Sequence, residues 1–258
     1  MKRRAWFVVL LTLSAMAGPV AAAAASLADT IARLKGSVVL VGTFRATDSP
    51  RFQLRGTGFI VGDGRMVITN AHVLPDDPTG ANAQAMVVQV RKPGASGWES
   101  RPVTLLGTDA PRDLALLRME GPPGPAAVVG DSSQVREGDA LAFMGFPIGG
   151  LLGYSTVTHR AMVSSITAAS LPSPTADRLS EQAIRGLRVG TYDIFQLDAT
   201  AYPGNSGGPL FDPGTGEVVG VMNMVLIKST RESAMSQPSG ISYAIPSRYV
   251  LELLARHR

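Results

Sequence analysis

One serine in the second half of the chain stands in a setting that suits a nucleophile. Ser206 lies in the run Gly204-Asn205-Ser206-Gly207-Gly208, and an apolar segment follows this run. A serine hydroxyl attacks a carbonyl carbon only weakly near neutral pH, so it needs a base beside it. Clusters of glycine, asparagine and serine also form ordinary turns, and a serine between glycines occurs at the sharp turn of a quite different fold. The rest of the chain must decide between these interpretations.

The candidate bases are the three histidines, His72, His159 and His257. His72 stands where an apolar run ends and a polar loop begins, so its ring can reach a cleft while its backbone stays anchored. A lone histidine in such a place is often structural. His159 lies in a β-branched stretch and His257 in the last turn of the chain, where structural roles are more usual still. We therefore predict His72 as the base.

A histidine base needs a carboxylate that fixes its tautomer and stabilises its charged form. The stretch TDAPRDLALLRM offers Asp109 and Asp113. We favour Asp113, because it begins a buried-looking strand at 114–117 and would be held rigidly away from water, although an aspartate there is usually a turn residue. The order His72, Asp113, Ser206 is one of the chain orders known for this triad.

The rival interpretation places the serine between a strand and a helix, with the acid and the histidine after it, and so makes His257 the base. Two features argue against it. Gly207-Gly208-Pro209 opens a helix poorly, and the downstream acids Asp212 and Glu217 lie very close to Ser206 in sequence. Alternating parallel βα units are also absent from the pattern.

The first 25 residues differ from the rest of the 258-residue chain. Lys2, Arg3 and Arg4 precede the apolar run 5–13 and the small-residue tract 21–25. This pattern predicts a secretory signal peptide over residues 1–25. A membrane anchor is the alternative, but the apolar run is shorter than the roughly 20 residues that a span requires. We expect a periplasmic or secreted protein without a stable membrane span after signal removal.

Composition narrows the chemistry. The chain has 24 basic and 20 acidic residues, and removing the three basic residues of the predicted signal leaves 21 against 20. No basic cluster remains that predicts nucleic-acid binding. The absence of cysteine excludes disulfides, a thiolate nucleophile and a cysteine-ligated metal, and the histidines lack the spacing of a zinc site. The chemistry must therefore come from hydroxyl, imidazole and carboxylate groups, and we expect that no metal or organic cofactor is required.

Short apolar runs between Gly, Pro and Asp breaks dominate from Ser37 onward, and they predict strands. In the run FIVGDGRMVI, Gly62-Asp63-Gly64 predicts a hairpin turn. Regular strand spacing favours barrels or a sandwich. The strongest helical pattern is terminal, where Ser247 is the expected N-cap and the helix is expected to pack on the second lobe. A shorter helix is expected at 27–35 and a long loop at 171–190.

Seven blocks, in order, resemble those of the trypsin-like serine proteases, and within them the HtrA/Deg group of exported bacterial quality-control proteases. They are TGFIV…VITNAHV, DLALLRM, GDSSQVREGDALAFMGFP, QLDAT, PGNSGGPLF, VVGVMNM and GISYAIP. The resemblance implies an all-β fold of two antiparallel six-stranded β-barrels within a protease domain at 26–258. Its expected parts are an N-terminal barrel at about 37–120, a linker at about 121–130, a C-terminal barrel at about 131–246 and a helix at about 247–256.

The resemblance also implies a site. His72 and Asp113 from the first barrel would meet Ser206 from the second, and the backbone N–H groups of Gly204 and Ser206 would form the oxyanion hole. Glycines at 204, 207 and 208 permit the dihedral angles that aim adjacent amides at one point. The expected wall of the substrate pocket consists of Thr200, Ala201, Tyr202, Pro203, Asn223, Met224 and Val225, with residues 240–242 beside them.

No charged residue lines this expected wall, so we predict small or medium apolar side chains at the cleaved position. The strand 223–225 would pair with an extended substrate, which predicts unfolded polypeptide as the substrate class. Further copies of the chain, in a homo-oligomer, are the other candidate partner. The chain departs from the HtrA pattern in two places. The 52 residues after Ser206 are too few for the PDZ domain that most HtrA-like proteases carry, and 171–190 matches no known block, so it could serve activation or assembly.

Two alternatives stay open. A latent or inactive protease-fold module for binding or chaperoning would keep all three triad residues without productive geometry. A narrow-specificity peptidase such as a glutamyl endopeptidase would be expected to place a histidine or other cation near Gly240, and the block SGISYAIP has none.

Overall fold

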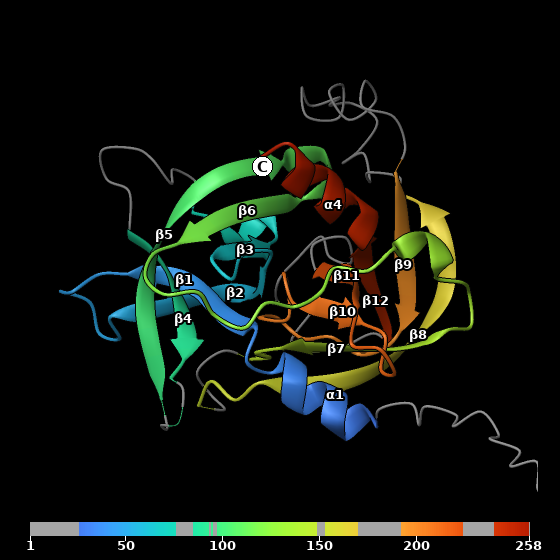
Figure 1. The fold of residues 1–258 in the computed structure, drawn as a ribbon, viewed down its shortest axis with the longest axis horizontal. Coiled ribbons are helices and arrows are strands. Elements are labelled where there is room, and N and C mark those ends of the chain that lie inside the picture. Colours follow the sequence, from blue (N-terminus) through green and yellow to red (C-terminus); the bar gives the residue numbers. More distant parts are fainter. Residues whose placement is uncertain are drawn as a thin grey trace, which may run out of the picture.

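Two closed barrels of antiparallel strands make up most of the structure, which is a computed structural model (Figure 1). The described residues are 26–75, 85–92, 94, 97–148, 153–169, 192–223 and 240–257. The predicted signal peptide, the predicted loop 171–190 and the pocket residues Met224 and Val225 lie outside them. The predicted all-β fold of two six-stranded barrels with a C-terminal helix is confirmed.

The first barrel closes through pairing of its first and fourth strands. Its strands, in spatial order, are β1 (Val38–Phe44), β2 (Phe52–Val61), β3 (Met66–Thr69), β6 (Leu114–Met119), β5 (Trp98–Asp109) and β4 (Ala85–Arg91). The predicted hairpin joins β2 to β3, and Gly62 and Gly64 in its turn have φ values of 62° and 80°. These left-handed conformations cost glycine little, which explains why the turn forms at this place.

The second barrel has the same strand number and follows the first in sequence. Its strands, in spatial order, are β7 (Ala140–Gly145), β8 (Val157–Ala168), β9 (Asp193–Asp198), β12 (Ile241–Pro246), β11 (Val218–Asn223) and β10 (Pro209–Phe211). The short strand β10 begins three residues after Ser206, so the segment that carries this serine enters the barrel directly.

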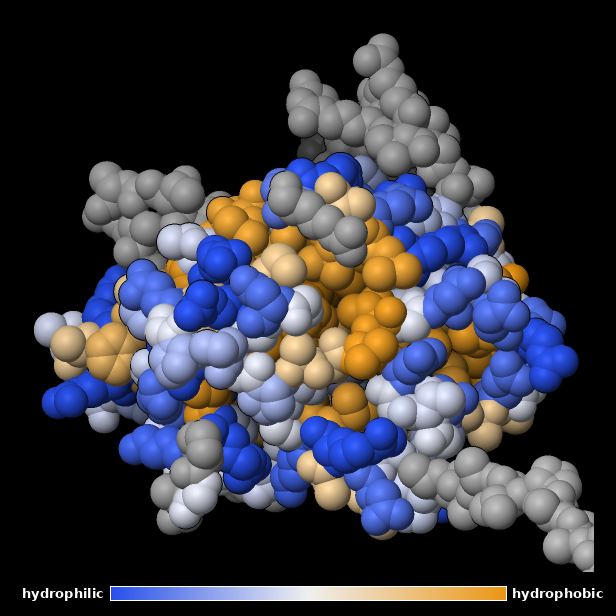
Figure 2. Space-filling view, in the orientation of Figure 1, coloured by the Kyte–Doolittle hydropathy of each residue, from blue (hydrophilic) through white to orange (hydrophobic). Residues whose placement is uncertain are grey.

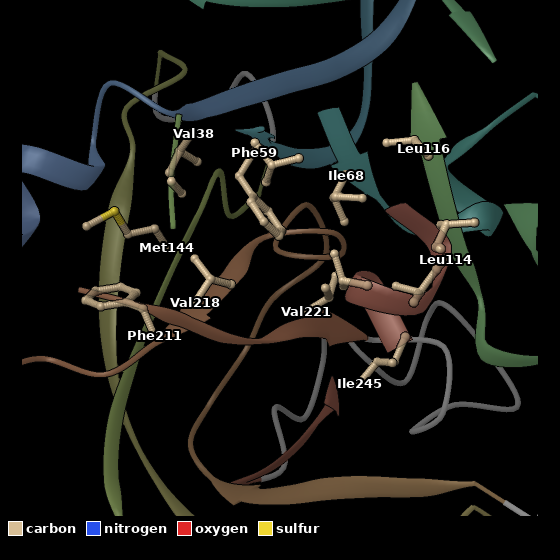
Figure 3. Packing of buried hydrophobic residues seen from close by; sticks show 14 of the residues in the cluster. Val38, Phe59, Ile68, Leu114, Leu116, Met144, Phe211, Val218, Val221 and Ile245 are labelled. Atoms are coloured by element: carbon tan, nitrogen blue, oxygen red, sulfur yellow. The ribbon is translucent and has the colours of Figure 1, made fainter. Parts of the chain in front are cut away.

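A hydrophobic core fills each barrel, and a third apolar cluster joins them. Strand β1 contributes to two of these clusters. Val39 and Val41 belong to the first barrel's core, and Val38 and Leu40 belong to the cluster shared by the two barrels. Alternate side chains of a strand point to opposite faces, so both faces of β1 are buried. Figure 3 shows this shared cluster, in which Val38, Phe59, Ile68, Leu114 and Leu116 face Met144, Phe211, Val218, Val221 and Ile245. Apolar packing therefore fixes the position of one barrel against the other.

The terminal helix α4 (Ser247–Ala255) packs on the second barrel, as the sequence predicts, and contacts the first barrel as well. It contacts β5 and β6 of the first barrel and β11 and β12 of the second, and its buried stripe includes Tyr249, Val250 and Leu253 (Figure 1). The predicted cap is wrong by one position. Pro246 occupies the N-cap position, and Ser247, the first helical residue, donates its hydroxyl to the carbonyl of Gly130 at 2.7 Å. The Ser247 hydroxyl is therefore used in a hydrogen bond to Gly130 of the linker and does not cap the helix.

The segment between the barrels follows their surface. The N–H of Ala127 donates to Ile60 O at 2.8 Å, and that of Gly130 donates to Val218 O at 2.9 Å. Val128, between these anchors, is an exposed apolar side chain, and Figure 2 shows apolar side chains gathered near the middle of the face in view.

At the other end of the chain, α1 (Leu27–Leu34) is capped by the Ser26 side chain. No helix of the described residues is long and apolar enough to span a membrane.

Candidate active site

His72 sits on a single 3-10 turn, η1 (Ala71–Val73), that follows strand β3. The turn is fixed at its end by Arg55, which donates from Nε to Val73 O at 2.6 Å and from Nη2 to Leu74 O at 2.7 Å. At its start, the buried Asn70 donates from Nδ2 to the carbonyl of Asp113 at 3.0 Å. The side chain of His72 is 29% exposed, so its backbone is anchored while its ring stays accessible, as the sequence predicts.

Asp113 follows the 3-10 turn η2 (Ala110–Arg112) and has a left-handed backbone, with φ 54° and ψ 44°. Few residues other than glycine adopt this conformation, and aspartate is among those that tolerate it. The conformation is held by hydrogen bonds to its carbonyl, which accepts from Ala71 N at 3.1 Å and from the Asn70 side chain. The loops that carry His72 and Asp113 are therefore tied to each other through their backbones.

The carboxylate of Asp113 accepts three hydrogen bonds. Oδ1 accepts from His72 N at 2.8 Å, and Oδ2 accepts from His72 Nδ1 at 2.5 Å and from Asn223 Nδ2 at 2.9 Å. Because a carboxylate can only accept, the proton of the neutral imidazole resides on Nδ1 and leaves Nε2 as an acceptor. This is the tautomer that a general base requires.

The competing aspartate has a different environment. Asp109 is 6% exposed, and its Oδ2 accepts from Arg112 at 3.0 Å and from Arg256 at 2.9 Å. Arg112 also pairs with Glu252, so this ionic cluster ties η2 to helix α4. The structure thus brings Asp113, and not Asp109, to the ring of His72.

Ser206 lies on the loop that precedes β10, and its carbonyl accepts from Thr57 N at 2.8 Å. Two glycines let this loop press against the neighbouring backbone. Gly204 has φ 102° and Gly207 has φ 84°, and a Cβ would collide with the Phe146 carbonyl at the first and with the Thr57 carbonyl at the second. A Cβ on Gly207 would also lie 3.2 Å from Asn70 N, which places the serine loop against the segment that leads to His72.

Within the described residues, no hydrogen bond joins the Ser206 hydroxyl to the His72 ring. The Ser206 residue is 5% exposed. Such bonds are often long in free enzymes and tighten only when the substrate binds. The structure therefore forms the histidine–aspartate half of the predicted triad and brings the serine loop beside it.

The backbone N–H groups of the serine loop divide into two sets. Those of Asn205, Gly207 and Gly208 donate to Tyr202 O, Met222 O and Asn205 O at 3.0, 2.9 and 3.0 Å. For the N–H groups of Gly204 and Ser206, the described part of the chain holds no acceptor. They are the two donors that the resemblance implies for an oxyanion hole.

The predicted pocket wall is partly described. Ser242 holds its first segment, because its Oγ donates to Ala199 O at 2.7 Å and accepts from Ala201 N at 3.1 Å. Thr200, Tyr202 and Pro203 follow in the same segment. Asn223 is 1% exposed, and its side chain donates to Asp113, a contact that no sequence pattern predicts.

The pKa of the buried Tyr192 is affected by the charge of Asp113. Burial raises the pKa of Tyr192 to about 12, and the negative charge of Asp113 adds to the rise. The ring of Tyr192 meets that of Tyr249 edge to face, with 6.0 Å between centroids. The phenol of Tyr192 therefore stays neutral, and its ring packs on Tyr249 of helix α4.

His159 is half-buried on strand β8 of the second barrel. Its ring stacks on Phe143 with 4.8 Å between centroids, and its Nε2 has no partner within the described residues. Burial lowers its pKa. The folded state therefore binds this proton less readily than the unfolded state, in which the pKa is about 6.5.

The lowered pKa of His159 predicts acid sensitivity. Its contribution to stability is complete above about pH 6.5 and is lost as the pH falls through the window between the unfolded and the folded pKa. Replacing His159 by glutamine should flatten the fall of Tm between about pH 7.5 and about pH 5, measured by thermal unfolding. The control His257→Gln, at an exposed histidine, should keep the wild-type slope, and equal slopes for all three proteins would contradict the assignment.

Comparison with known proteins agrees with this geometry. Residues 56–221 match the trypsin-like peptidase domain, and the chain belongs to this family. Among its relatives are HtrA-type serine proteases. It is 32% identical over 201 residues to "Serine protease HTRA2, mitochondrial" of Drosophila willistoni and 34% identical over 199 residues to "Probable periplasmic serine endoprotease DegP-like" of Marinomonas sp. (strain MWYL1). These alignments cover 78% and 77% of this chain but only 38% and 34% of those proteins.

A solved structure supports the same relationship. The fold matches "HtrA-type protease AlgW with tripeptide" with a TM-score of 0.64 and 26% sequence identity, over 90% of this chain and 63% of that one. The predicted resemblance to trypsin-like and HtrA/Deg proteases is thus confirmed.

Proposed function

We propose that the chain is an exported serine endopeptidase that cleaves unfolded or extended polypeptides through an acyl-enzyme. The observation that carries this proposal is the hydrogen bond from His72 Nδ1 to Asp113 Oδ2 on one barrel, beside the Ser206 loop of the other. It leaves His72 Nε2 free to accept a proton from a nucleophile. The family, whose members include serine proteases, supports the same assignment.

The reaction follows from these groups. His72 Nε2 takes the proton of Ser206 Oγ as this oxygen attacks the substrate carbonyl carbon, and Asp113 stabilises the imidazolium. The N–H groups of Gly204 and Ser206 donate to the developing oxyanion. One such donor lowers the activation free energy by about 3 kcal/mol. The imidazolium then protonates the leaving amine. A water deprotonated by His72 attacks the ester, releases the acid and restores Ser206.

The substrate class rests on the wall of the predicted pocket. Its described residues, 200–203, 223 and 240–242, carry no charge, which favours small or medium apolar side chains such as Val, Ala or Leu. Asn223 ends strand β11, and we propose that the chain beyond it pairs with an extended substrate. Export is proposed from the signal pattern at 1–25, and one relative is named periplasmic and another mitochondrial.

A latent form is the second candidate, because no hydrogen bond joins Ser206 to His72 in the described residues. In that case the same fold would bind polypeptides without cleaving them until the serine moves toward the histidine. The two candidates differ in whether Ser206 reacts.

One experiment separates these candidates. Protein beginning at Ser26 is incubated with an unfolded, apolar-rich polypeptide beside Ser206→Ala, cleavage sites are mapped by mass spectrometry, and a serine-reactive phosphonate probe is applied to both. We expect only the wild type to cleave, after Val, Ala or Leu, and to be labelled at Ser206. Cleavage after Glu would favour the glutamyl endopeptidase alternative. Neither cleavage nor labelling of the wild type would favour the latent or binding module.

A further inference from the structure

Thr57, in the middle of strand β2, is fully buried at the point where the first barrel meets the serine loop of the second. Its N–H donates to Ser206 O at 2.8 Å, and its hydroxyl donates to Gly204 O at 2.5 Å. The same hydroxyl oxygen accepts from Phe146 N at 3.1 Å, just beyond strand β7. One residue of the first barrel thus binds the loop on both sides of Asn205.

We propose that Thr57 is a positioning residue that aims the oxyanion-hole amides of Gly204 and Ser206. This inference rests on the proposed peptidase function, which it deepens. The two amides belong to the peptide groups Pro203–Gly204 and Asn205–Ser206, and the group between them is Gly204–Asn205. Its carbonyl is the one that the Thr57 hydroxyl holds. Rotation of this middle group would turn both neighbouring amides away from a common point.

Within the loop, the peptide group Gly204–Asn205 has one hydrogen bond of its own, from Asn205 N to Tyr202 O at 3.0 Å, and its carbonyl needs a second anchor from outside the loop. Gly204 has φ 102° and no side chain, so its backbone can rotate at little cost. The side chain of Asn205 is fully buried, and neither its Oδ1 nor its Nδ2 has a partner among the described residues. The outer carbonyl of Pro203 accepts from Ile148 N at 2.8 Å. The middle carbonyl depends on Thr57.

Thr57 is itself held in place. Its carbonyl accepts from the hydroxyl of Thr69 at 2.8 Å, and its backbone lies opposite Leu40 of β1 in the barrel sheet. A hydroxyl on a β-branched side chain has few rotamers, so the direction of the hydrogen bond to Gly204 is set by the barrel. The first barrel therefore contributes both the base and the support of the oxyanion hole.

The test replaces the hydroxyl by a methyl group of the same shape. Removing one oxyanion donor costs about 10²–10³ in kcat, and the loss of an anchor behind it should cost less, so we expect Thr57→Val to lower kcat by about 10- to 100-fold with KM nearly unchanged. The inhibition constant of a peptide aldehyde, whose adduct places an oxyanion in the hole, should rise by the same factor. Thr57→Ser keeps the hydroxyl and should stay within a few-fold of the wild type.

Control measurements separate positioning from folding. Thr43→Val makes the same change at a buried threonine of β1 and should leave kcat unchanged. Active sites are counted with the phosphonate probe, and Tm is measured for each variant. If activity falls only in proportion to labelled enzyme, or if Thr57→Ser loses as much as Thr57→Val, Thr57 is merely structural and the proposal is overturned.

Hydrogen exchange of the segment 202–208, followed by mass spectrometry, judges the proposal independently of turnover. We expect faster exchange in Thr57→Val than in Thr57→Ser or Thr43→Val. A wild type that neither cleaves nor takes the probe overturns the peptidase function, whereas an active wild type with an equally active Thr57→Val overturns only the role of Thr57. Unchanged exchange in Thr57→Val overturns the positioning role in either case.

Discussion

Replacing His72 by glutamine should lower kcat by about 10⁶-fold, the loss typical of a triad histidine, because Ser206 then has no group to take its proton. The fold should survive the change. The backbone of the η1 turn is held by Arg55, Asn70 and the carbonyl of Asp113, and none of these bonds involves the imidazole. His72 is also partly exposed, so a shorter polar side chain leaves no large cavity.

The measurement is single-turnover cleavage of the unfolded substrate, with circular dichroism and Tm to establish folding. His257→Gln serves as the matched control, since it makes the same change at an exposed residue of the last turn, and it should retain wild-type turnover. If His72→Gln remained active while folded, the base would have to be another group, and the proposed triad would be wrong.

Much of the fold follows from the sequence because turn chemistry and strand period are local properties. The hairpin at Gly62 and Gly64 needs residues that tolerate positive φ, and the sequence supplies them between two apolar runs. The helix α4 begins at Ser247, as predicted, but its N-cap is Pro246 and not Ser247, and the reason is nonlocal. The hydroxyl of Ser247 is taken by Gly130 of the linker, and no local pattern predicts that contact.

The residues of the candidate site also differ in whether local sequence is enough to identify them. A strand end followed by a polar loop marks His72, and a glycine-rich turn marks Ser206, so both can be found by local reading. The choice of Asp113 over Asp109 depends on which carboxylate faces the histidine and which faces Arg112 and Arg256, and sequence gives only a preference.

No local sequence pattern identifies Thr57 and Asn223, the residues that support the serine loop and Asp113. Thr57 has the appearance of an ordinary β-branched strand residue, and its partners at 204 and 206 lie in the other barrel. Asn223 is predicted in the pocket wall, and no sequence pattern predicts the hydrogen bond from its side chain to Asp113. Alternation along β11 indicates that a side chain is on one face or the other, whereas the partner on that face depends on how the two barrels pack.

Asp113→Asn should lower kcat by about 10⁴-fold while the protein remains folded. An asparagine that turns its amide nitrogen toward His72 donates to Nδ1, which moves the imidazole proton to Nε2 and removes the acceptor that Ser206 needs. The left-handed backbone at this position suits asparagine as well as aspartate. The carbonyl contacts to Ala71 and Asn70 are unaffected, so the two loops should stay tied together.

The matched control is Asp109→Asn, which removes the same charge from a carboxylate that binds two arginines instead of the histidine. It should lower Tm, because Arg112 and Arg256 lose their buried partner, and leave kcat per folded molecule near the wild-type value. The double variant His72→Gln/Asp113→Asn should lose no more activity than His72→Gln alone, since residues of one triad act as a unit. A loss of only a few-fold in Asp113→Asn, with a much larger loss in folded Asp109→Asn, would move the orienting role to Asp109 and contradict the hydrogen-bonded pair from which the mechanism is built.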